Sequence, residues 1–339
     1  MNPQSQTAQL QLFLKKCLIL ASPFLLLSVT YFIWDPFQVF KDKEDYYTNC
    51  RVEPNRDWVS TRLYLSHAQS QHYDSFIFGS SRSLSYRCDD WQQFLPGIRP
   101  FHFDAANESL FGVWSKLRFL DKRDQPIKNV ILGFDSEILK NTKNLKSHLF
   151  IKHPLVSGGS MLEFHMVTFA AYFQKLFFAK YIDFRLSGQY HDWMGGLIHY
   201  KAFGFTLPTN DSYIDPAFEW LTDPKGYLES HSQIFYPREN TIKDNAPRVI
   251  NLESEIMLRD IRKVLDRKGA DWRVIIHPLY DQIIFNRDDL NLLQEIFGAD
   301  RVYDFSGNPE FTNDPTHYID SSHFKPAIGK EVLRRVYAR

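Results

Sequence analysis

The sequence predicts an α/β fold, with a parallel sheet covered on both faces by helices, a large and mostly helical insertion, and one N-terminal transmembrane helix. Three observations support this fold class. Five short apolar runs, each suited to a buried strand, alternate with segments of helical periodicity. The alternation stops between about residues 140 and 250, which indicates the insertion. Residues 17–34 form an uncharged run near the N-terminus.

The expected elements follow one another in a regular order along the chain. Strands are predicted at residues 74–79, 100–104, 129–134, 272–277 and 301–305. Helices are predicted at residues 58–69, 80–94, 108–122, 252–266, 290–297 and 325–339. The longer helices repeat apolar side chains at three- and four-residue spacing, so each can bury one face against the sheet.

The run 17–34 is long enough to cross a bilayer, since it spans roughly 27 Å at 1.5 Å per residue. Lys15 and Lys16 precede it, so residues 1–16 are expected to be a cytoplasmic tail. The run ends in bulky residues that do not suit signal-peptide cleavage, which favours a retained, single-pass anchor in the cell membrane. A buried core helix is the alternative. Residues 35–56 are expected to form a stalk, and residues 57–339 an extracytoplasmic, periplasmic domain.

Within the insertion, residues 161–184 form a long apolar stretch rich in phenylalanine. A cap helix packed over the active edge of the sheet is the expected structure. An amphipathic helix that lies on the bilayer or on a partner is the alternative. Glu163, His165, Lys175 and Lys180 disfavour a second membrane span.

Composition restricts the class of partner. The 339 residues carry 40 Lys and Arg and 40 Asp and Glu, so the zero net charge gives no reason to expect nucleic acid. Aromatic residues make up 16% of the chain and serve a large core, a carbohydrate-facing surface or a membrane-facing one. No Gly-rich phosphate loop is present, and the spacing of the histidines matches no compact metal motif. Neither a cofactor nor a metal is expected.

The proposed topology places the three cysteines in different surroundings. Cys17 lies in the membrane run, whereas Cys50 and Cys88 share an oxidising compartment. A Cys50–Cys88 disulfide is therefore expected, with two unpaired thiols as the alternative.

The candidate nucleophile follows the first strand, where Gly79 is succeeded by Ser80 and Ser81. A serine between a buried strand and a helix lies at the carboxyl edge of the sheet, where open α/β proteins have their sites. It also faces the positive end of the helix dipole, which favours a developing oxyanion. We therefore expect Ser81 to be the nucleophile, although Gly-Ser-Ser is also an ordinary turn sequence.

Arg82 follows the candidate nucleophile directly. Its guanidinium suits a substrate carboxylate or phosphate. A structural ion pair with Asp104 or Asp135 is the other role open to it, and is favoured over substrate binding.

The candidate base lies before the final helix, where Asp320 and His323 are three residues apart. On a tight loop this spacing lets the carboxylate hold one ring nitrogen while the other faces outward, as a general base requires. His317 is close by and is an alternative base.

These motifs together resemble the SGNH/GDSL hydrolase superfamily: Gly-x-Ser after the first strand, and Asp-x-x-His before the last helix. The resemblance covers about residues 74–138 and 251–339. It implies a flavodoxin-like, three-layer sheet, with Ser81 as nucleophile, His323 as base and Asp320 as the group that orients the base.

The resemblance also implies three oxyanion donors. The first is the backbone N–H of the nucleophile, Ser81. The second, a glycine N–H after the second strand in that family, falls on residues 105–107, and Ala106 is expected to supply it. The third family donor is an Asn side chain after the third strand, but Asp135 stands here, and an ionised carboxylate cannot donate. Asn107 is the expected substitute.

A membrane-anchored subset with Gly-Ser-Ser fits better, and is similar to proteins of teichoic-acid D-alanylation and alginate O-acetylation. This implies a serine acyltransferase or esterase that acts on a cell-envelope polysaccharide. The implied partners are that polysaccharide or an acyl carrier, a membrane-bound O-acyltransferase, and the bilayer around residues 17–34. The alternative is a degenerate SGNH domain that binds glycan or scaffolds the acyltransferase.

Overall fold

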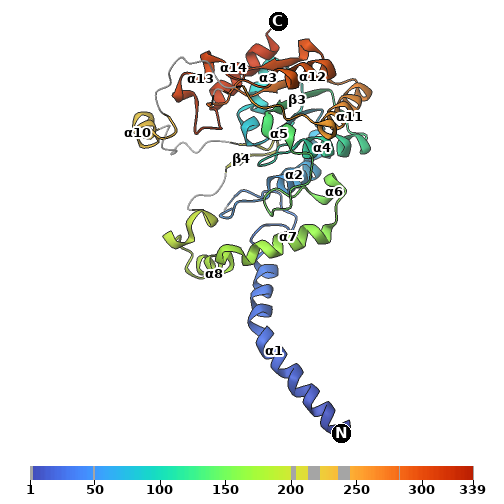
Figure 1. Cartoon of the computed structure of the whole chain (residues 1–339), viewed down its shortest axis with the longest axis vertical. Coiled ribbons are helices and arrows are strands. Elements are labelled where there is room, and N and C mark those ends of the chain that lie inside the picture. The colour runs from blue at the N-terminus through green and yellow to red at the C-terminus, as the bar shows by residue number, and fades with distance from the viewer. Residues whose placement is uncertain are drawn as a thin grey trace.

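The computed structural model describes residues 3–48, 50–199, 204–212, 222–235, 245–281 and 283–338. A long helix, α1 (Pro3–Trp34), projects from one end of a globular domain, and the chain ends at the opposite end of that domain (Figure 1). Parts of the expected insertion, residues 200–203, 213–221 and 236–244, lie outside the described residues.

Five parallel strands form the central sheet, in the order β2-β1-β3-β6-β7. They are β1 (Ser75–Phe78), β2 (Pro100–His102), β3 (Asn129–Phe134), β6 (Asp271–Ile276) and β7 (Val302–Asp304). The order reverses between β1 and β3. In open parallel sheets, ligands bind at such a reversal, beyond the carboxyl ends of the strands.

Helices flank the strands, most of them at the places that the sequence predicts, and the short helices at residues 136–140 and 309–312 are additional. The flanking helices are α2 (Arg56–Gln71), α3 (Cys88–Phe94), α4 (Leu110–Lys122), α5 (Ser136–Lys140), α11 (Leu252–Lys268), α12 (Arg287–Phe297), α13 (Pro309–Thr312) and α14 (Pro326–Tyr337). One prediction differs. The residues after Gly79 form a 3-10 turn, η1 (Ser81–Ser85), before the short helix α3. Two side chains stabilise this turn: Oγ of Ser80 accepts the backbone N–H of Arg82, and Oγ of Ser83 donates to the carbonyl of Ser80.

Polar residues begin the long helices and glycine ends one of them. The side chains of Asn55, Ser109 and Asn251 accept backbone N–H groups at the starts of α2, α4 and α11. Gly269 ends α11 in the left-handed region, at φ 62°.

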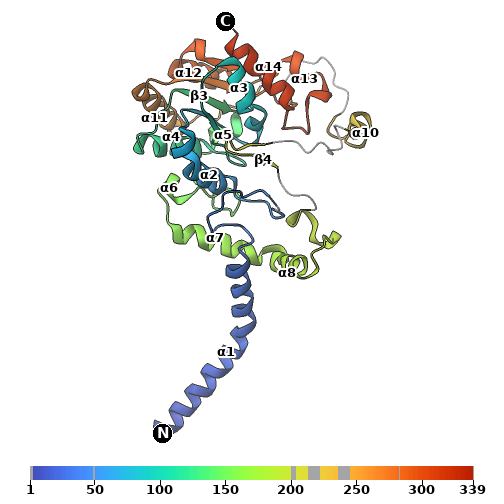
Figure 2. The same cartoon turned by 180° about the vertical axis from the view of Figure 1, so that it is seen from behind.

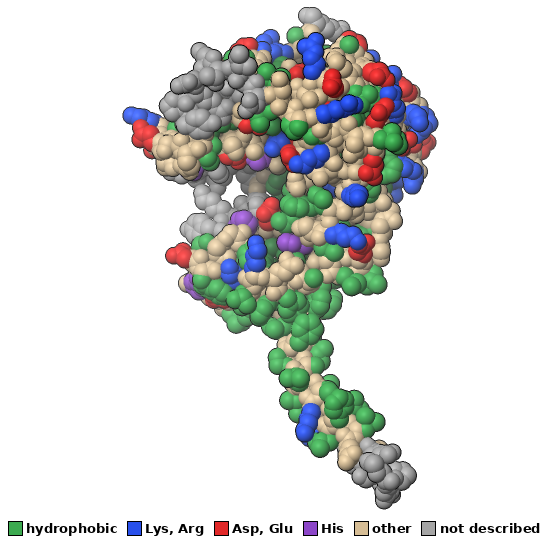
Figure 3. Space-filling model, viewed as in Figure 1, with side chains coloured by type: hydrophobic (Ala, Val, Ile, Leu, Met, Phe, Trp, Pro, Cys, Tyr) green, Lys and Arg blue, Asp and Glu red, His purple; other side chains and the backbone are tan. Residues whose placement is uncertain are grey.

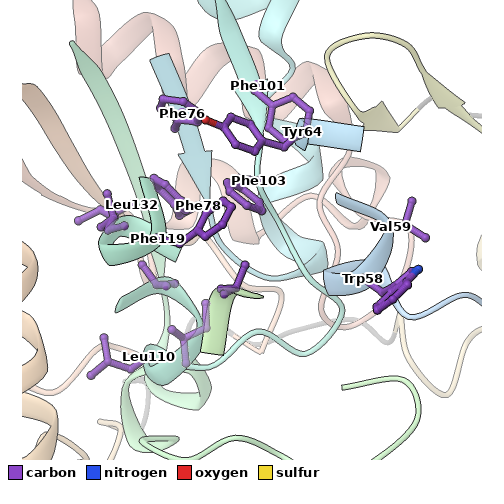
Figure 4. Packing of buried hydrophobic residues seen from close by; sticks show 14 of the residues in the cluster. Trp58, Val59, Tyr64, Phe76, Phe78, Phe101, Phe103, Leu110, Phe119 and Leu132 are labelled. Carbon is purple, nitrogen blue, oxygen red and sulfur yellow. The ribbon is translucent and has the colours of Figure 1, made fainter. Parts of the chain in front are cut away.

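Both faces of the sheet are covered. On β1, Phe76 and Phe78 pack into one hydrophobic cluster with α2, α4, α11 and α12, whereas Ile77 packs into a second cluster with α3 and α14. Strands buried on both faces account for the unbroken apolar runs in the sequence. The aromatic residues of the first cluster gather around β1 and β2, as Figure 4 shows for Tyr64, Phe101 and Phe103.

The N-terminal helix is longer than the apolar run predicts. A stretch of α1, Gln9–Trp34, is long and apolar enough to cross a membrane, and only 6% of its most apolar window is buried. Residues 3–16, expected to be a tail, continue the same helix. Residues 35–56, expected to form a stalk, pack against the domain instead, with Tyr46, Tyr47 and Val52 in its core.

The described insertion consists of short elements on two sides of the domain. They are α6 (Pro154–Ser157), α7 (Met161–Phe173), η2 (Gln174–Leu176), α8 (Phe177–Ser187), η3 (Asp192–Leu197), β4 (Phe205–Thr206), β5 (Asp211–Ser212) and α10 (Pro224–Ser230). Both α7 and α8 lie at the end from which α1 projects (Figure 2). The ring of Phe164 stacks on Trp58 of α2, and Tyr31 of α1 contacts Phe169. This differs from the cap over the sheet edge that the sequence favours.

The expected Cys50–Cys88 disulfide is wrong, because both residues are buried free thiols. Sγ of Cys50 donates to the carbonyl of Val52, 3.0 Å away, within the segment beside α1. Cys88 begins α3, and its backbone N–H donates to Asp211. Cys50 is therefore held by its own segment, whereas Cys88 is held by Asp211 of the insertion.

Candidate active site

The nucleophile turn begins where β1 ends. A side chain at Gly79 would approach Cβ of Ser83 to 2.7 Å and the carbonyl of Gly133 to 3.2 Å, so only glycine fits between the strands. Ser80 then starts the 3-10 turn, and its Oγ accepts the N–H of Arg82. This tight exit leaves Ser81 half-buried at the carboxyl edge of the sheet.

The structure brings together the three residues that the sequence singles out. Oγ of Ser81 lies 2.8 Å from Nε2 of His323, across 242 positions of sequence. Nδ1 of the same ring lies 2.8 Å from Oδ2 and 3.0 Å from Oδ1 of Asp320. The carboxylate therefore favours a proton on Nδ1, which leaves Nε2 as the acceptor that faces the hydroxyl.

A small loop holds the aspartate and the histidine. Tyr318 and Phe324 pair across it in an antiparallel bridge, and the N–H of Ile319 donates to the carbonyl of His323. Oδ1 of Asp320 accepts the backbone N–H groups of Ser322 and His323, at 2.7 and 2.9 Å. Burial raises the pKa of Asp320, but the hydrogen bonds from the His323 ring and from these N–H groups outweigh it, so this pKa is lowered.

The two halves of the site are in direct contact behind the reacting groups. Oγ of Ser85, in the nucleophile turn, donates to the carbonyl of Phe324 in the histidine loop. Gly329 of α14 lies directly against the carbonyl of Ser85, where a Cβ would clash with backbone. The close approach of α14 therefore joins the turn and the loop.

The alternative base, His317, lies elsewhere in the loop. Its Nδ1 lies 2.8 Å from the carbonyl of Phe311, and its Nε2 lies 3.5 Å from Asp314. It therefore does not face Ser81.

The expected oxyanion donors differ in whether they reach the pocket beside Ser81. In the described part of the chain, no acceptor binds the backbone N–H of Ser81, Ala106 or Asn107. Asn107 lies in the left-handed region, at φ 46°, and lines a pocket together with Ser81 and His323. Ala106 is half-buried and is not among the residues that line this pocket. Asn107, and not Ala106, therefore lines the pocket beside Ser81.

A buried network of charges holds the loop that carries Asn107. Nζ of Lys116 lies 2.6 Å from Glu108 and 3.1 Å from Asp57, and Lys152 lies 2.5 Å from the other oxygen of Glu108. All four side chains are fully buried. Paired charges of this kind are costly to break, because removing one partner leaves the others without compensation.

Arg82 forms the structural ion pair that the sequence favours, and its partner is Asp135. Its Nη1 lies 2.7 Å from Oδ2 of Asp135, whose other oxygen accepts the N–H of Ile138 at the start of α5. Asp135 is almost fully buried and committed to these two partners, so it is an acceptor and not an oxyanion donor.

Two pockets meet at this ion pair. The pocket at Ser81 has a volume of about 160 Å³ and is lined by Ser81, Asn107, Glu108 and His323, among others. A larger pocket of about 410 Å³ shares Arg82, Asp135 and Glu137 with it. Its further wall is mostly apolar and is formed by Val249, Ile276, Leu279, Ile283 and Phe285.

The sequence does not identify two histidines near the site as functional candidates. His277 follows β6, lines the larger pocket, and has Nδ1 2.9 Å from the hydroxyl of Tyr86. Burial lowers the pKa of His277 to about 4, so its ring is neutral. The position of His277 at a strand end, before Pro278, was the available signal.

The second, His102, belongs to a buried group of a serine, a histidine and an aspartate, the same residue types as Ser81, His323 and Asp320. Its Nε2 lies 3.1 Å from Oγ of Ser83, and its Nδ1 lies 3.1 Å from Asp211. Ser83 and His102 are fully buried beneath the turn, so they support Ser81 and have no access to a substrate. Because Asp211 lies in the insertion, no local motif reveals this contact.

No protein-family model matches the chain, and no curated protein matches it. Within the described residues, no group of three or more His, Cys, Asp or Glu side chains is arranged to hold a metal ion.

Proposed function

We propose that the chain is a membrane-anchored, extracytoplasmic enzyme of SGNH type that transfers an acyl group to or from a cell-envelope polysaccharide. One observation carries the proposal: Ser81 Oγ, the His323 ring and Asp320 form a continuous chain of contacts of 2.8 Å each. The strand order, with its reversal between β1 and β3, supports the same family type.

In the first half of the reaction, Oγ of Ser81 attacks the carbonyl carbon of an acyl ester. Nε2 of His323 takes the hydroxyl proton, and Asp320 stabilises the imidazolium that forms. The carbonyl oxygen becomes an oxyanion, and the N–H groups of Ser81 and Asn107 are its donors. The ester bond then breaks, the leaving alcohol receives the proton from His323, and the acyl group remains on Ser81.

In the second half, an acceptor hydroxyl attacks the acyl-serine. His323 removes the proton of the acceptor and returns a proton to Oγ of Ser81 as the new ester leaves. A sugar hydroxyl as acceptor makes the enzyme a transferase, and water makes it an esterase. The larger apolar pocket beside Arg82 and Asp135 has room for a second substrate, which favours transfer. A membrane-bound O-acyltransferase that loads the acyl group is the proposed partner.

A fluorophosphonate probe tests the nucleophile. The full chain in detergent is expected to react, and Ser81→Ala is expected not to. Ser80→Ala is the matched control, because it removes the neighbouring hydroxyl, which lines the same pocket, and leaves the triad in place. Equal labelling of wild type and Ser81→Ala excludes the proposed mechanism.

A second function is favoured by Asp135. This carboxylate replaces the amide donor that the family resemblance implies, and its ion pair with Arg82 keeps it an acceptor. The chain would then be a degenerate domain that binds glycan or scaffolds an acyltransferase. Absence of probe labelling, together with glycan binding that survives Ser81→Ala, supports this second function.

A further inference from the structure

Helix α7 is apolar on two opposite faces. Its inner face, with Phe164, Thr168 and Tyr172, is fully buried against the domain and α1. Its outer face carries Leu162 and Met166, which are 70% and 62% exposed. Helices that are apolar all round are normally buried in a core or in lipid. The domain does not cover the outer face of α7, so we ask what else does.

The same outer surface continues beyond α7. The two helices are joined by the bend at η2, where Leu176 is 60% exposed, and α8 adds Leu186, which is 79% exposed. Figure 3 shows apolar side chains gathered on the underside of the domain around the base of α1. We call the outer side chains of α7 and α8 the basal face: Leu162, Met166, Leu176 and Leu186.

The depth at which α7 crosses α1 indicates what covers the basal face. Phe24 and Phe32, two turns apart on α1, both contact Phe169, with ring centroids 6.3 and 6.0 Å apart. Phe24 also stacks on Phe173, at 5.0 Å. At 1.5 Å per residue, Phe24 lies roughly 15 Å before the end of α1. The crossing therefore lies within the apolar stretch Gln9–Trp34, not beyond it.

The crossing is fixed by polar contacts as well as by ring packing. The hydroxyl of Tyr172 lies 2.7 Å from Oγ1 of Thr30, and the hydroxyl of Tyr31 lies 2.8 Å from Oγ1 of Thr168. These side chains satisfy one another at the junction, as polar groups must in an apolar environment. A bilayer that surrounds α1 therefore also reaches α7.

The ends of the basal face suit the boundary between lipid and water. Trp34, at the end of α1, packs on Tyr181 of α8, and the Arg185 guanidinium lies 5.7 Å from the Trp34 ring centroid. Lys175 is exposed at the bend between the helices. Trp and Tyr rings favour the headgroup level, and basic side chains favour anionic headgroups.

We infer that α7 and α8 lie in the outer leaflet of the bilayer that α1 crosses, with the basal face in contact with lipid. The domain is then held by three helical segments and does not swing freely on a single anchor. This inference does not depend on the proposed catalytic function, since none of its residues belongs to the triad.

The test uses the full chain with Cys17→Ser in lipid nanodiscs that contain brominated phosphatidylcholine. A bimane fluorophore is attached at Leu162→Cys or Met166→Cys, one variant at a time. The matched controls are Leu252→Cys and Ile256→Cys, apolar residues of α11 that are 74% and 60% exposed. We expect loss of most of the emission at 162 and 166, and unchanged emission at 252 and 256.

Two results would overturn the inference. The first is equal emission in brominated and ordinary lipid at both basal positions, with the same access to a soluble quencher as position 252. The second is emission that is insensitive to bromine but shielded from the soluble quencher, in discs that hold two copies of the chain. A second copy, not lipid, would then cover the basal face.

Discussion

The imidazole of His323 links two half-buried groups: Nε2 lies 2.8 Å from the hydroxyl of Ser81, and Nδ1 lies 2.8 Å from the carboxylate of Asp320. Asp320→Asn keeps the size of the side chain but favours the wrong tautomer of the ring. We expect kcat for a small acetyl ester to fall by about 10⁴-fold. Asp314→Asn, three residues before His317, is the control and should retain activity. An unchanged rate in Asp320→Asn would contradict the proposed role of the carboxylate.

The buried lysine of α4 gives the second prediction. Lys116→Met leaves Glu108 and Asp57 to share Lys152 alone, and it should lower the free energy of unfolding by about 3–5 kcal/mol. Lys225→Met is the matched control, because that side chain is 87% exposed, and it should change stability by less than about 0.5 kcal/mol. Urea unfolding of the full chain in mild detergent measures both. Similar values for the two variants would refute the importance of the network.

The third prediction concerns the unequal burial of Arg82 and Asp135, whose side chains are 19% and 4% exposed. Arg82→Met removes the only ion-pair partner that the described residues offer Oδ2 of Asp135, and should cost about 3 kcal/mol of stability. Asp135→Asn keeps the oxygen that accepts the Ile138 N–H and leaves an arginine that reaches water, so it should cost about 1 kcal/mol. Thermal unfolding should show a larger loss of stability in Arg82→Met than in Asp135→Asn. A larger loss in Asp135→Asn would contradict the view that burial of the carboxylate determines the cost of breaking the pair.

The fourth prediction is a loss of stability in acid. Burial lowers the pKa of both His153 and His277 from 6.5 to about 4. The unfolded chain therefore binds protons that the folded chain does not, so stability is full above pH 6.5 and falls as the pH drops towards 4. Each fully depressed histidine contributes up to about 3 kcal/mol to this change.

His153→Asn tests this directly. Asparagine can still accept the N–H of Leu155 at the start of α6, as His153 does, but it does not titrate. The variant should be less stable at pH 7, because the stacking on Trp58 is lost, and its stability should depend less on pH between 6.5 and 4. Parallel stability–pH curves for variant and wild type would disprove the assignment.

The fifth prediction follows from the free cysteines. Burial raises the pKa of Cys50 to about 11, and burial also raises that of Cys88 well above its usual range. Neither thiol should react with a disulfide reagent in the folded chain, whereas all three cysteines should react after denaturation without reductant. If fewer than three thiols react in the denatured, unreduced chain, the result would support the predicted Cys50–Cys88 disulfide.

The local features of the fold follow from the sequence. Residues 129–134 form β3 at the predicted bounds, because an unbroken apolar run has no other way to be buried. Asp320 and His323 meet because they are three residues apart in a small loop. The pairing of this loop with Ser81 was predicted from family resemblance and from the rule that parallel strands end at one edge.

The long-range features do not follow from the sequence. Nothing in the sequence marks Lys116, Lys152 and Glu108 as core residues, and only the folded structure brings them together there. The aromatic residues of 35–56 are buried because the domain offers them a surface, which composition does not reveal. A shared compartment made a Cys50–Cys88 pair possible, but pairing requires two cysteines to be neighbours in space.

The contact of Gly329 with the carbonyl of Ser85 places the C-terminal helix α14 against the turn that carries Ser81. During synthesis the N-terminal part of a chain emerges and begins to fold first, so β1 and its serine turn precede the loop of His323 by most of the translation time. The hydroxyl remains unactivated until α14 has left the ribosome and its glycine docks on the turn. With the proposed orientation and the proposed mechanism, a nascent chain in transit would therefore be inactive, and acyl transfer would begin only on the far side of the membrane.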